Sequence, residues 1–307
     1  MIRDKLKNIY LRLKFYGLGN KSILKNNSMI FIMDNDYHKV HPGLVDRFKA
    51  IIGVYYIAKM NDRDFYLCYN TPFRLEKYLL PNKVNWHIDR KKISHCIFDT
   101  RLLKYNAKAE VPILNNSIKE YHCYSYLGFN ILREQHHKKW EEEWHDLFWE
   151  LFQISPYLKK KMEDCAPTTD YVAVHLRFVN ALDNFESGYD NQLDDEEKTK
   201  LIDNCLKKLE EIRRQNNTKE IYVFSDSKRF IKIAEKNGYK ALKGIDNVGH
   251  ITFSNSDDTY DKTFIDFFSL SRAEEVYAIR GGALYNSVYP QYASIVGGAK
   301  FTVVSID

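Results

Sequence analysis

A histidine and an arginine stand two residues apart at the end of an apolar run, in YVAVHLRF at positions 171–178. Alternate residues of an extended chain share a face, so His175 and Arg177 lie on one face and the intervening apolar residues on the other. A planar guanidinium binds phosphate oxygens through two parallel hydrogen bonds. The pair therefore indicates a strand end that holds an anionic ligand such as a diphosphate. The alternatives are a surface salt bridge for Arg177 and a satisfied core histidine for His175.

Two further strand ends carry polar or glycine-rich groups. EIYVFSD at 220–226 ends in Asp226, and the strand expected at 276–279 is followed by Gly281 and Gly282, ahead of a helix expected over 285–295. A helix start binds phosphate through its free N–H groups, and glycines let the phosphate approach closely. Ligands of open α/β sheets bind outside the carboxyl ends of the strands. Together, the three ends predict a nucleotide or nucleotide-sugar site, in which Asp226 faces the ribose or base, caps the next helix, or does both.

Two α/β halves are expected to position these groups. Residues 28–34, 44–60 and 65–69 have the pattern of a βαβ unit, with Gly43 in the turn before its helix. An amphipathic helix is predicted over 138–152, and Ser155 is predicted to cap the next helix. The second half alternates strands at 172–176, 220–226, 276–279 and 301–304 with helices at 195–214, 228–236 and 285–295. The expected divisions are a basic segment 1–27, an N-terminal domain 28–165 and a C-terminal, nucleotide-sugar-binding domain 166–307.

Composition narrows the class of protein. The chain has 307 residues, 44% hydrophobic and 28% charged, which indicates a globular protein of two domains. Its five cysteines are far apart and lack CxxC spacing, which argues against a zinc site or disulfide framework and suits a reducing compartment. No run of 18 apolar residues and no signal-peptide core is present. We therefore expect a cytoplasmic protein without a metal or cofactor.

The net charge of +5 is concentrated near the N-terminus, where residues 1–27 contain seven Lys or Arg and one acid, Asp4. Apolar residues recur there at the spacing of an amphipathic helix (Ile2, Leu6, Ile9, Tyr10, Leu13 and Tyr16). Residues 1–17 either lie on an anionic membrane surface, peripheral to the inner membrane, or pack on the protein body with their lysines in water. The rest of the chain is close to neutral, which argues against a nucleic-acid partner.

Two motifs resemble the fucosyltransferase superfamily, which includes protein O-fucosyltransferases, α1,6-fucosyltransferases and bacterial nodulation fucosyltransferases. VAVHLRFVNALDNFESG is similar to the family segment HLRFE-x-DM-x-AF, and GLVDRFKAIIGVYYIAKMNDRDFYL is similar to a segment that begins GLGDRLKG. TPFRLEKYLLPNKVNW resembles the continuation of the second segment, and FIDFFSLSRAEEVYAIRGGALYNSVY more loosely resembles the segment before the family's last phosphate-binding helix. The matching positions are His175, Leu176, Arg177, Phe178 and Phe185, then Gly43, Leu44, Asp46, Arg47 and Lys49, and then Phe73, Leu75, Pro81 and Trp86.

The sequence departs from the family pattern at three places. Val45 replaces the second glycine of GLGDR, and Ala181 replaces an aspartate, with Asp183 two residues later. Gly281 and Gly282 replace small hydroxyl residues before the last helix. These departures leave the diphosphate site in place and leave the identity of the sugar open.

The resemblance implies a GT-B architecture, in which two Rossmann-like domains face each other across a cleft and the second holds the nucleotide. It implies a metal-independent inverting transferase that uses GDP-fucose. Arg177 would clamp the β-phosphate and Arg47 would add a second cation. His175 would line the nucleotide beside Gly281 and Gly282. Further binding positions implied by the resemblance are Gly43, Asp46 and Asp266, with Asp266 reading the guanine edge or, alternatively, serving as a plain charge on a helix surface.

The predicted function is transfer of fucose to a glycan hydroxyl in bacterial surface polysaccharide synthesis. Two alternatives stay open: a non-catalytic nucleotide- or sugar-binding module on the same scaffold, and a transferase that uses another nucleotide sugar. An inverting transfer uses a carboxylate or histidine near the acceptor hydroxyl. The candidates for this base are Asp34, Asp36, His38, His41 and Asp183.

Overall fold

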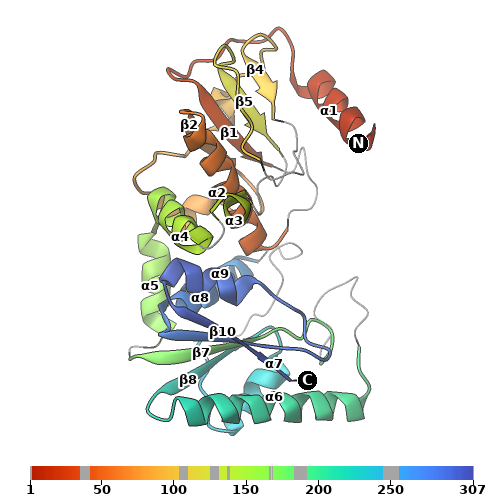
Figure 1. Cartoon of the computed structure of the whole chain (residues 1–307), viewed down its shortest axis with the longest axis vertical. Helices are drawn as coiled ribbons and strands as arrows, with labels where there is room; N and C mark the ends of the chain where they lie inside the picture. Colours follow the sequence, from red (N-terminus) through yellow and green to blue (C-terminus); the bar gives the residue numbers. More distant parts are fainter. Residues whose placement is uncertain are drawn as a thin grey trace. The chain divides into compact units, whose positions relative to one another are not determined.

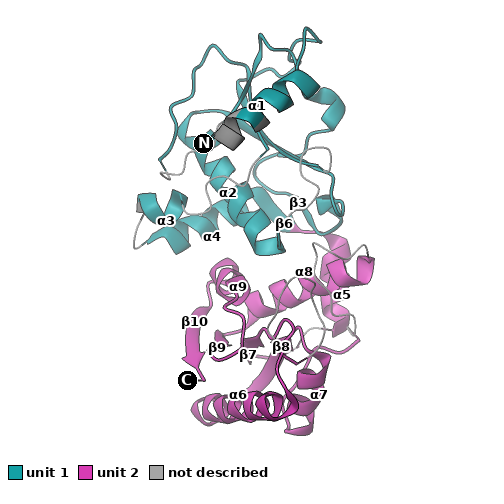
Figure 2. Ribbon diagram, turned by 90° about the vertical axis from the view of Figure 1, so that its right-hand side faces the viewer, with its two compact units in different colours: residues 1–153 teal, residues 154–307 magenta. Residues whose placement is uncertain are grey.

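The computed structural model describes residues 2–34, 42–103, 110–124, 131–136, 139–165, 167, 169–182, 192–244 and 256–306. The chain forms two compact units, Met1–Gln153 and Ile154–Asp307 (Figure 2). The predicted domain boundary lies after residue 165, whereas α5 (Pro156–Cys165) lies in unit 2. A hydrogen bond from Tyr157 Oη to Asp261 Oδ2 at 2.6 Å ties α5 to α8 (Asp257–Arg272).

Unit 1 is built on a four-stranded parallel sheet with strand order β2-β1-β5-β4. Its strands are β1 (Ser28–Met33), β2 (Asp64–Tyr69), β4 (Thr100–Leu102) and β5 (Glu120–Cys123). The helix α2 (Leu44–Met60) connects β1 to β2, which confirms the predicted βαβ unit. Every residue of β1 is buried, because this strand lies inside the sheet.

The remaining elements of unit 1 cover the sheet or lie at its margin. They are α1 (Ile2–Phe15), β3 (Leu79–Pro81), α3 (Ile131–His136), α4 (Trp140–Leu151) and the start of β6 (Phe152–Ile154), with single 3-10 turns at Leu75–Lys77 and Arg90–Lys92. The predicted amphipathic helix at 138–152 is confirmed as α4, whose Trp144 and Phe148 are buried and stacked. Figure 1 shows α1 apart from α2, α3 and α4.

Unit 2 contains a second four-stranded parallel sheet, with strand order β10-β9-β7-β8. Its strands are β7 (Tyr171–Leu176), β8 (Glu220–Ser225), β9 (Glu275–Arg280) and β10 (Lys300–Ser305). The helices α6 (Asp195–Gln215) and α7 (Lys228–Lys236) cover one face, and α5, α8 and α9 (Tyr289–Gly297) cover the other (Figure 1). The chain continues from β7 to β8 on one side and later to β9 on the other. The strand order therefore reverses beside β7, as at the ligand site of doubly wound α/β sheets.

The alternation predicted for β7 is confirmed. Val172, Val174, Leu176 and Phe178 all join the apolar cluster formed with α6 and α7. The opposite face of β7 meets α8 and α9, where Tyr171 Oη donates a hydrogen bond to the carbonyl oxygen of Ser269. His175 is consequently on the α8–α9 side of the sheet.

Close packing of α8 and α9 depends on one glycine. A Cβ at Gly297 would lie 1.6 Å from the carbonyl oxygen of Ser271, at the end of α8. No side chain fits there without moving the backbone, so Gly297 fixes how near α9 comes to α8. Among the described residues, no helix is both long and apolar enough to cross a membrane.

The predicted helix over 285–295 begins later than expected, at Tyr289. Gly281 and Gly282 adopt φ values of 102° and 53° in a turn directly after β9. The backbone N–H of Tyr285 donates to the carbonyl oxygen of Arg177 at 2.8 Å, which holds residue 285 at the end of β7 and outside the helix. Gly281 and Gly282 therefore lie in a turn well ahead of α9 and not at the helix start, and their role in binding phosphate stays a prediction. Their positive φ angles serve the turn.

Candidate functional site

The carboxyl end of β7 gathers three cations around a neutral histidine. Burial, together with the positive charges of Arg177, Arg280 and Lys262, lowers the pKa of His175 to about 3. The imidazole is therefore uncharged at neutral pH, so that it has one N–H donor and one acceptor nitrogen to offer a ligand and no positive charge. Its ring lies 5.8 Å from the ring of Tyr289, the first residue of α9.

Arg177 directly follows β7 and is held on two sides. Its guanidinium lies over the ring of Tyr285, with 5.1 Å from Cζ to the ring centroid, and its Nε is 3.9 Å from Asp226 Oδ2. The side chain keeps 21% of its surface exposed. A ring below and a carboxylate beside the guanidinium limit its orientation. Arg177 is thus a partly exposed, oriented cation at the switch point of the sheet.

Asp226 holds the turn that follows Arg177. Its Oδ1 accepts a hydrogen bond from the N–H of Phe178 at 2.8 Å, and its Oδ2 accepts one from the N–H of Val179 at 2.9 Å. Val179 has φ of 53°, which is rare for a β-branched residue and costs about 1–3 kcal/mol. Burial raises the pKa of Asp226, against the lowering effect of these N–H groups and of Arg177. The carboxylate therefore offsets backbone strain beside the candidate site.

The residue after Asp226 caps α7. Capping of this helix was one of the two roles considered for Asp226. Ser227 Oγ accepts a hydrogen bond from the N–H of Phe230 at 3.1 Å, so Ser227 is the N-cap. The capping alternative for Asp226 is wrong, because both of its oxygens are engaged by the turn after β7. A role in facing the ribose or base stays a prediction.

The loop between β9 and α9 contains a small hydroxyl residue that sequence reasoning did not select. Ser287 is buried; its Oγ accepts from the N–H of Tyr289 at 3.2 Å, and its carbonyl oxygen accepts from Arg280 at 2.9 Å. The resemblance aligns Gly281 and Gly282 with small hydroxyl residues of the family, whereas in this chain a hydroxyl residue lies just before the helix itself. The Ser-x-Tyr-Pro spacing at 287–290 was the available signal, since proline favours the first turn of a helix.

Asp266 lines a pocket beside the edge strand of the sheet. The pocket has a volume of about 360 Å³, and its wall includes Phe224 and Ser225 of β8, Leu242, and Lys262 and Asp266 of α8. Asp266 Oδ2 accepts a hydrogen bond from Lys262 at 2.6 Å, whereas its buried Oδ1 has no hydrogen-bond partner among the described residues. Burial raises the pKa of Asp266, and Lys262 opposes that rise.

This environment excludes one of the two roles considered for Asp266. The side chain is only 16% exposed, so it is not a plain surface charge. A buried acceptor that lacks a donor costs about 1–3 kcal/mol, which a ligand N–H group would recover. Lys262 was missed at the sequence level, although its i, i+4 spacing from Asp266 predicts an ion pair on one helix face.

The candidate residues of unit 1 are arranged differently. Arg47 is 1% exposed and donates to the carbonyl oxygens of Pro42 (2.8 Å) and Thr71 (3.0 Å) and to Tyr69 Oη (3.0 Å). These contacts fasten the start of α2 to the segment after β2. A catalytic role of Arg47 stays a prediction, but the geometry gives it a structural one.

Asp46 and Gly43 also serve the start of α2. Asp46 lies in the first turn, where its carboxylate favours the helix dipole, and pairs with Lys49 at 3.2 Å. Gly43 is the N-cap and has φ of −59°, which other residues also adopt. Neither contact points to a ligand, and their binding roles stay predictions.

Among the candidate bases, Asp34 lies in the described part of the chain, and Asp36, His38, His41 and Asp183 lie outside it. Asp34 follows β1, is 5% exposed, and has Oδ2 3.3 Å from Arg90. The neighbours of β1 are β2 on one side and β5 on the other, so this residue stands at the strand-order reversal of unit 1. The described residues contain no group of three or more His, Cys, Asp or Glu side chains suited to a metal ion.

Comparison with known proteins identifies the fold. A mutant of FUT1 from Arabidopsis thaliana in complex with GDP is 10% identical, with a TM-score of 0.55 over 98% of this chain and 74% of that one. The α1,6-fucosyltransferase NodZ soaked with GDP-fucose is 11% identical, with a TM-score of 0.55 over 88% of this chain and 93% of that one. NodZ from Bradyrhizobium in selenomethionine form, also 11% identical, gives 0.54 over 88% and 92%.

The chain has the GT-B fold of these fucosyltransferases. The fold implied by the sequence resemblance is thereby confirmed, and each of the two units contains a four-stranded parallel sheet. Neither a family model nor a curated protein matches the sequence. In these two units, candidate site residues lie at the carboxyl ends of β7 and β1, which is where sheets of this kind bind ligands.

Proposed function

We propose that the protein is a glycosyltransferase that binds GDP-fucose in unit 2 and transfers fucose, with inversion, to a glycan hydroxyl. The observation that carries the proposal is the site at the strand-order reversal of unit 2. There Arg177 is oriented beside His175, and the pocket of Asp266 lies next to the adjacent strand β8. Solved proteins with this fold include enzymes in complex with GDP or soaked with GDP-fucose.

In our proposal, different residues of unit 2 bind the nucleotide and stabilise the transition state. The guanine N1–H and exocyclic amino group are donors, which suits the buried carboxylate of Asp266. As the bond between the sugar and the diphosphate breaks, negative charge grows on the β-phosphate, and Arg177 stabilises that charge. Protein cations of this kind make the transfer metal-independent in our proposal. His175 remains neutral and lines the nucleotide.

The acceptor side is assigned to unit 1. Asp34 is the proposed general base among the described candidates, since it is a buried carboxylate at the carboxyl end of a central strand. A role in bacterial surface polysaccharide synthesis, in the cytoplasm and near the inner membrane, rests on the sequence resemblance and on the basic N-terminal helix.

The test measures nucleotide binding and turnover separately. Calorimetry with GDP and ADP should show selective binding of GDP, and Asp266→Asn should weaken GDP binding by about tenfold to a hundredfold, because a hydrogen bond to a charged group contributes about 1.5–3 kcal/mol. Asp195→Asn, on a fully exposed side chain of α6, is the matched control.

Release of GDP from GDP-fucose with glycan acceptors then tests the chemistry. Turnover supports the transferase. GDP binding without any turnover would favour the non-catalytic module, and preference for another nucleotide sugar would reassign the donor. Equal affinity of the wild type and Asp266→Asn for GDP would contradict the base pocket.

A further inference from the structure

Unit 1 exposes a set of large apolar side chains around α1, which we call the N-terminal apolar face. The set comprises Leu6, Ile9, Tyr10 and Leu13 of α1, Leu18 and Ile23 of the segment that follows, and Ile97 and Phe98 of a loop before β4. Leu13 is 81% exposed, Leu18 80% and Phe98 66%. Large apolar side chains grouped in this way on a protein surface indicate an interaction site.

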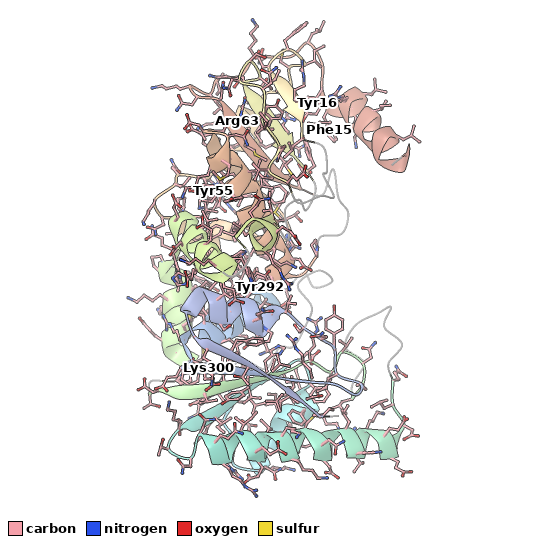
Figure 3. The ribbon with its side chains drawn as sticks, in the orientation of Figure 1. Phe15, Tyr16, Tyr55, Arg63, Tyr292 and Lys300 are labelled. Carbon is pink, nitrogen blue, oxygen red and sulfur yellow. The ribbon has the colours of Figure 1, made fainter. Side chains whose placement is uncertain are left out.

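The exposure of α1 argues against one of the two arrangements considered for it, packing on the protein body. A helix packed on the protein body would bury its apolar stripe, yet Leu6, Ile9 and Leu13 are 62%, 55% and 81% exposed. Among the described side chains of this segment, Phe15 and Tyr16 at the end of the helix pack on the cluster that contains Ile30 and Ile32 of β1 (Figure 3). The stripe therefore faces away from the described body of unit 1.

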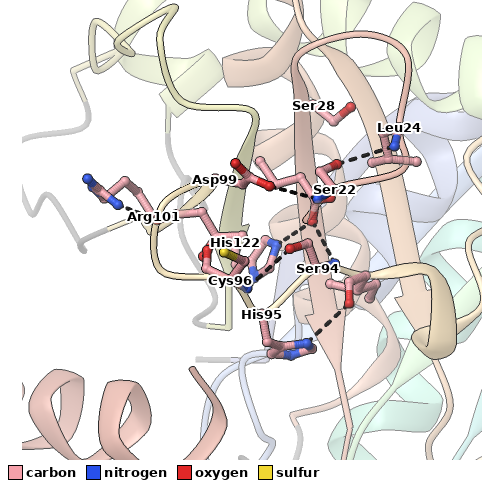
Figure 4. A network of polar contacts seen from close by, with 12 residues as sticks. Ser22, Leu24, Ser28, Ser94, His95, Cys96, Asp99, Arg101 and His122 are labelled. Atoms are coloured by element: carbon pink, nitrogen blue, oxygen red, sulfur yellow. Dashed lines mark hydrogen bonds and ion pairs between the residues drawn. The ribbon is translucent and has the colours of Figure 1, made fainter. Parts of the chain in front are cut away.

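A polar network fixes this face to the sheet (Figure 4). Tyr16 Oη lies 2.6 Å from His122 Nδ1, and His122 Nε2 lies 2.9 Å from Glu120, in a pair that is fully buried. The backbone of Gly17 then bridges to the loop before β4, accepting from the N–H of Ile97 at 3.0 Å.

Two more contacts continue the attachment along the chain. The N–H of Ser22 donates to Asp99 at 2.8 Å, and Ser94 Oγ donates to the carbonyl oxygen of Asn20 at 2.9 Å. Leu18 and Ile97 directly follow the two bridged residues, Gly17 and Cys96. The loop carrying Ile97 and Phe98 is thus joined to the segment after α1, so the two belong to one surface.

Cations border the apolar side chains. Arg12 and Lys14 are exposed and, at about 100° per residue, stand on either side of Leu13 around the helix. Lys21 and Lys25 are exposed in the following segment. Residues 1–27 carry seven basic side chains and one acid, more positive charge than the net +5 of the whole chain.

We propose that the N-terminal apolar face binds an anionic lipid bilayer, with the apolar side chains in the interface and the cations at the headgroups. Amphipathic segments rich in Lys and Arg bind such surfaces by apolar burial together with electrostatic attraction. A second copy of the chain is the poorer occupant, because it would bring the same excess of positive charge against this one. The inference does not rest on the proposed transferase activity.

The experiment is flotation of the full-length protein with vesicles of phosphatidylcholine alone or with phosphatidylglycerol added. We expect binding to the anionic vesicles and weak binding to the neutral ones. Leu13→Gln and Phe98→Ser should each weaken binding by about tenfold or more, since burying one such side chain contributes about 1.5–3 kcal/mol. Lys14→Gln should weaken it by about fivefold on anionic vesicles, at about 1 kcal/mol per cation.

Ile113→Ser is the matched control, because Ile113 is 98% exposed yet lies outside this face, between Pro112 and Leu114, which contact Asn61 at the end of α2. Its vesicle binding should equal that of the wild type. The melting temperature, measured in parallel, should be unchanged in every variant and so shows that each is folded.

Two results would overturn the proposal. One is equal binding of the wild type, Leu13→Gln and Phe98→Ser to anionic vesicles. The other is sedimentation showing that Leu13→Gln dissociates an oligomer while vesicle binding is absent in the wild type. Loss of binding in Leu13→Gln with full binding in Phe98→Ser would overturn the extension of the face beyond α1.

Discussion

Arg47 and Arg177 are the two arginines that the resemblance places at a diphosphate, and their surroundings differ. Arg47 is 1% exposed and donates to two carbonyl oxygens and a tyrosine hydroxyl. The Arg177 side chain is 21% exposed, over the ring of Tyr285 and beside Asp226. A guanidinium engaged by main-chain carbonyls stabilises the fold, whereas one that is oriented and partly exposed is placed to meet a ligand.

The largest effect is expected from Arg177→Ala. Turnover of GDP-fucose should fall about 10²–10³-fold, the usual cost of losing one group that stabilises transition-state charge. The melting temperature should change little. Arg213→Ala is the matched control, since Arg213 also covers a tyrosine ring, at 4.9 Å from Tyr239, on an exposed part of α6. Wild-type turnover by Arg177→Ala would remove Arg177 from the catalytic site.

Arg47→Met should act on stability instead. It deprives the carbonyl oxygens of Pro42 and Thr71 of a charged donor, at a cost of about 3 kcal/mol in the free energy of unfolding. Urea denaturation measures this loss, and calorimetry should find GDP affinity unchanged. A stable Arg47→Met protein with impaired turnover would show that the two arginines share a catalytic role.

Asp226→Ala and Ser227→Ala distinguish the contribution of the turn after β7 from that of the helix cap of α7. Asp226→Ala should destabilise the protein by about 2 kcal/mol and also weaken GDP binding, because the turn at Val179 loses both acceptors and Arg177 loses its carboxylate. Ser227→Ala should cost about 1 kcal/mol with GDP affinity intact. Identical behaviour of the two variants in calorimetry would contradict a positioning role for Asp226.

The last effect concerns the dependence of stability on pH and is absent at neutral pH. The pKa of His175 is about 3 in the folded protein and near 6.5 when unfolded, so the unfolded chain binds the extra proton between these values. Stability is therefore full above about pH 6.5 and falls as the pH decreases, by up to about 1.4 kcal/mol per pH unit. His175→Leu should flatten this decline in urea titrations at pH 4–7, and an unchanged slope would show that His175 is protonated in the fold.

Much of the fold followed from local patterns. Periodicity located the strands of the unit 2 sheet, β1 and β2 of unit 1, the helices α2, α4, α6 and α7, and the division into two α/β halves. The short strands β4 and β5 of unit 1 were not predicted. Prediction failed around α9, because a hydrogen bond between the N–H of Tyr285 and the carbonyl oxygen of Arg177 keeps residue 285 out of the helix. Such a contact joins segments far apart in the sequence and leaves no local trace. The helix α8 was not among the predicted helices, although Ser256 at the N-cap and Asp257 and Asp258 in the first turn are start signals that the sequence offers.

The local pattern of apolar residues was enough to predict which residues alternate in β7, and hence that His175 and Arg177 share the face opposite the apolar cluster. The partners of the charged side chains, by contrast, depend on the tertiary structure. In the fold, the Arg47 guanidinium donates to carbonyl oxygens of two separate segments. Asp226 accepts hydrogen bonds from the turn after β7, and Asp266 lines a pocket. The reason is physical: side-chain direction repeats every two residues along a strand, whereas the partner of a charged group depends on segments that only folding brings together.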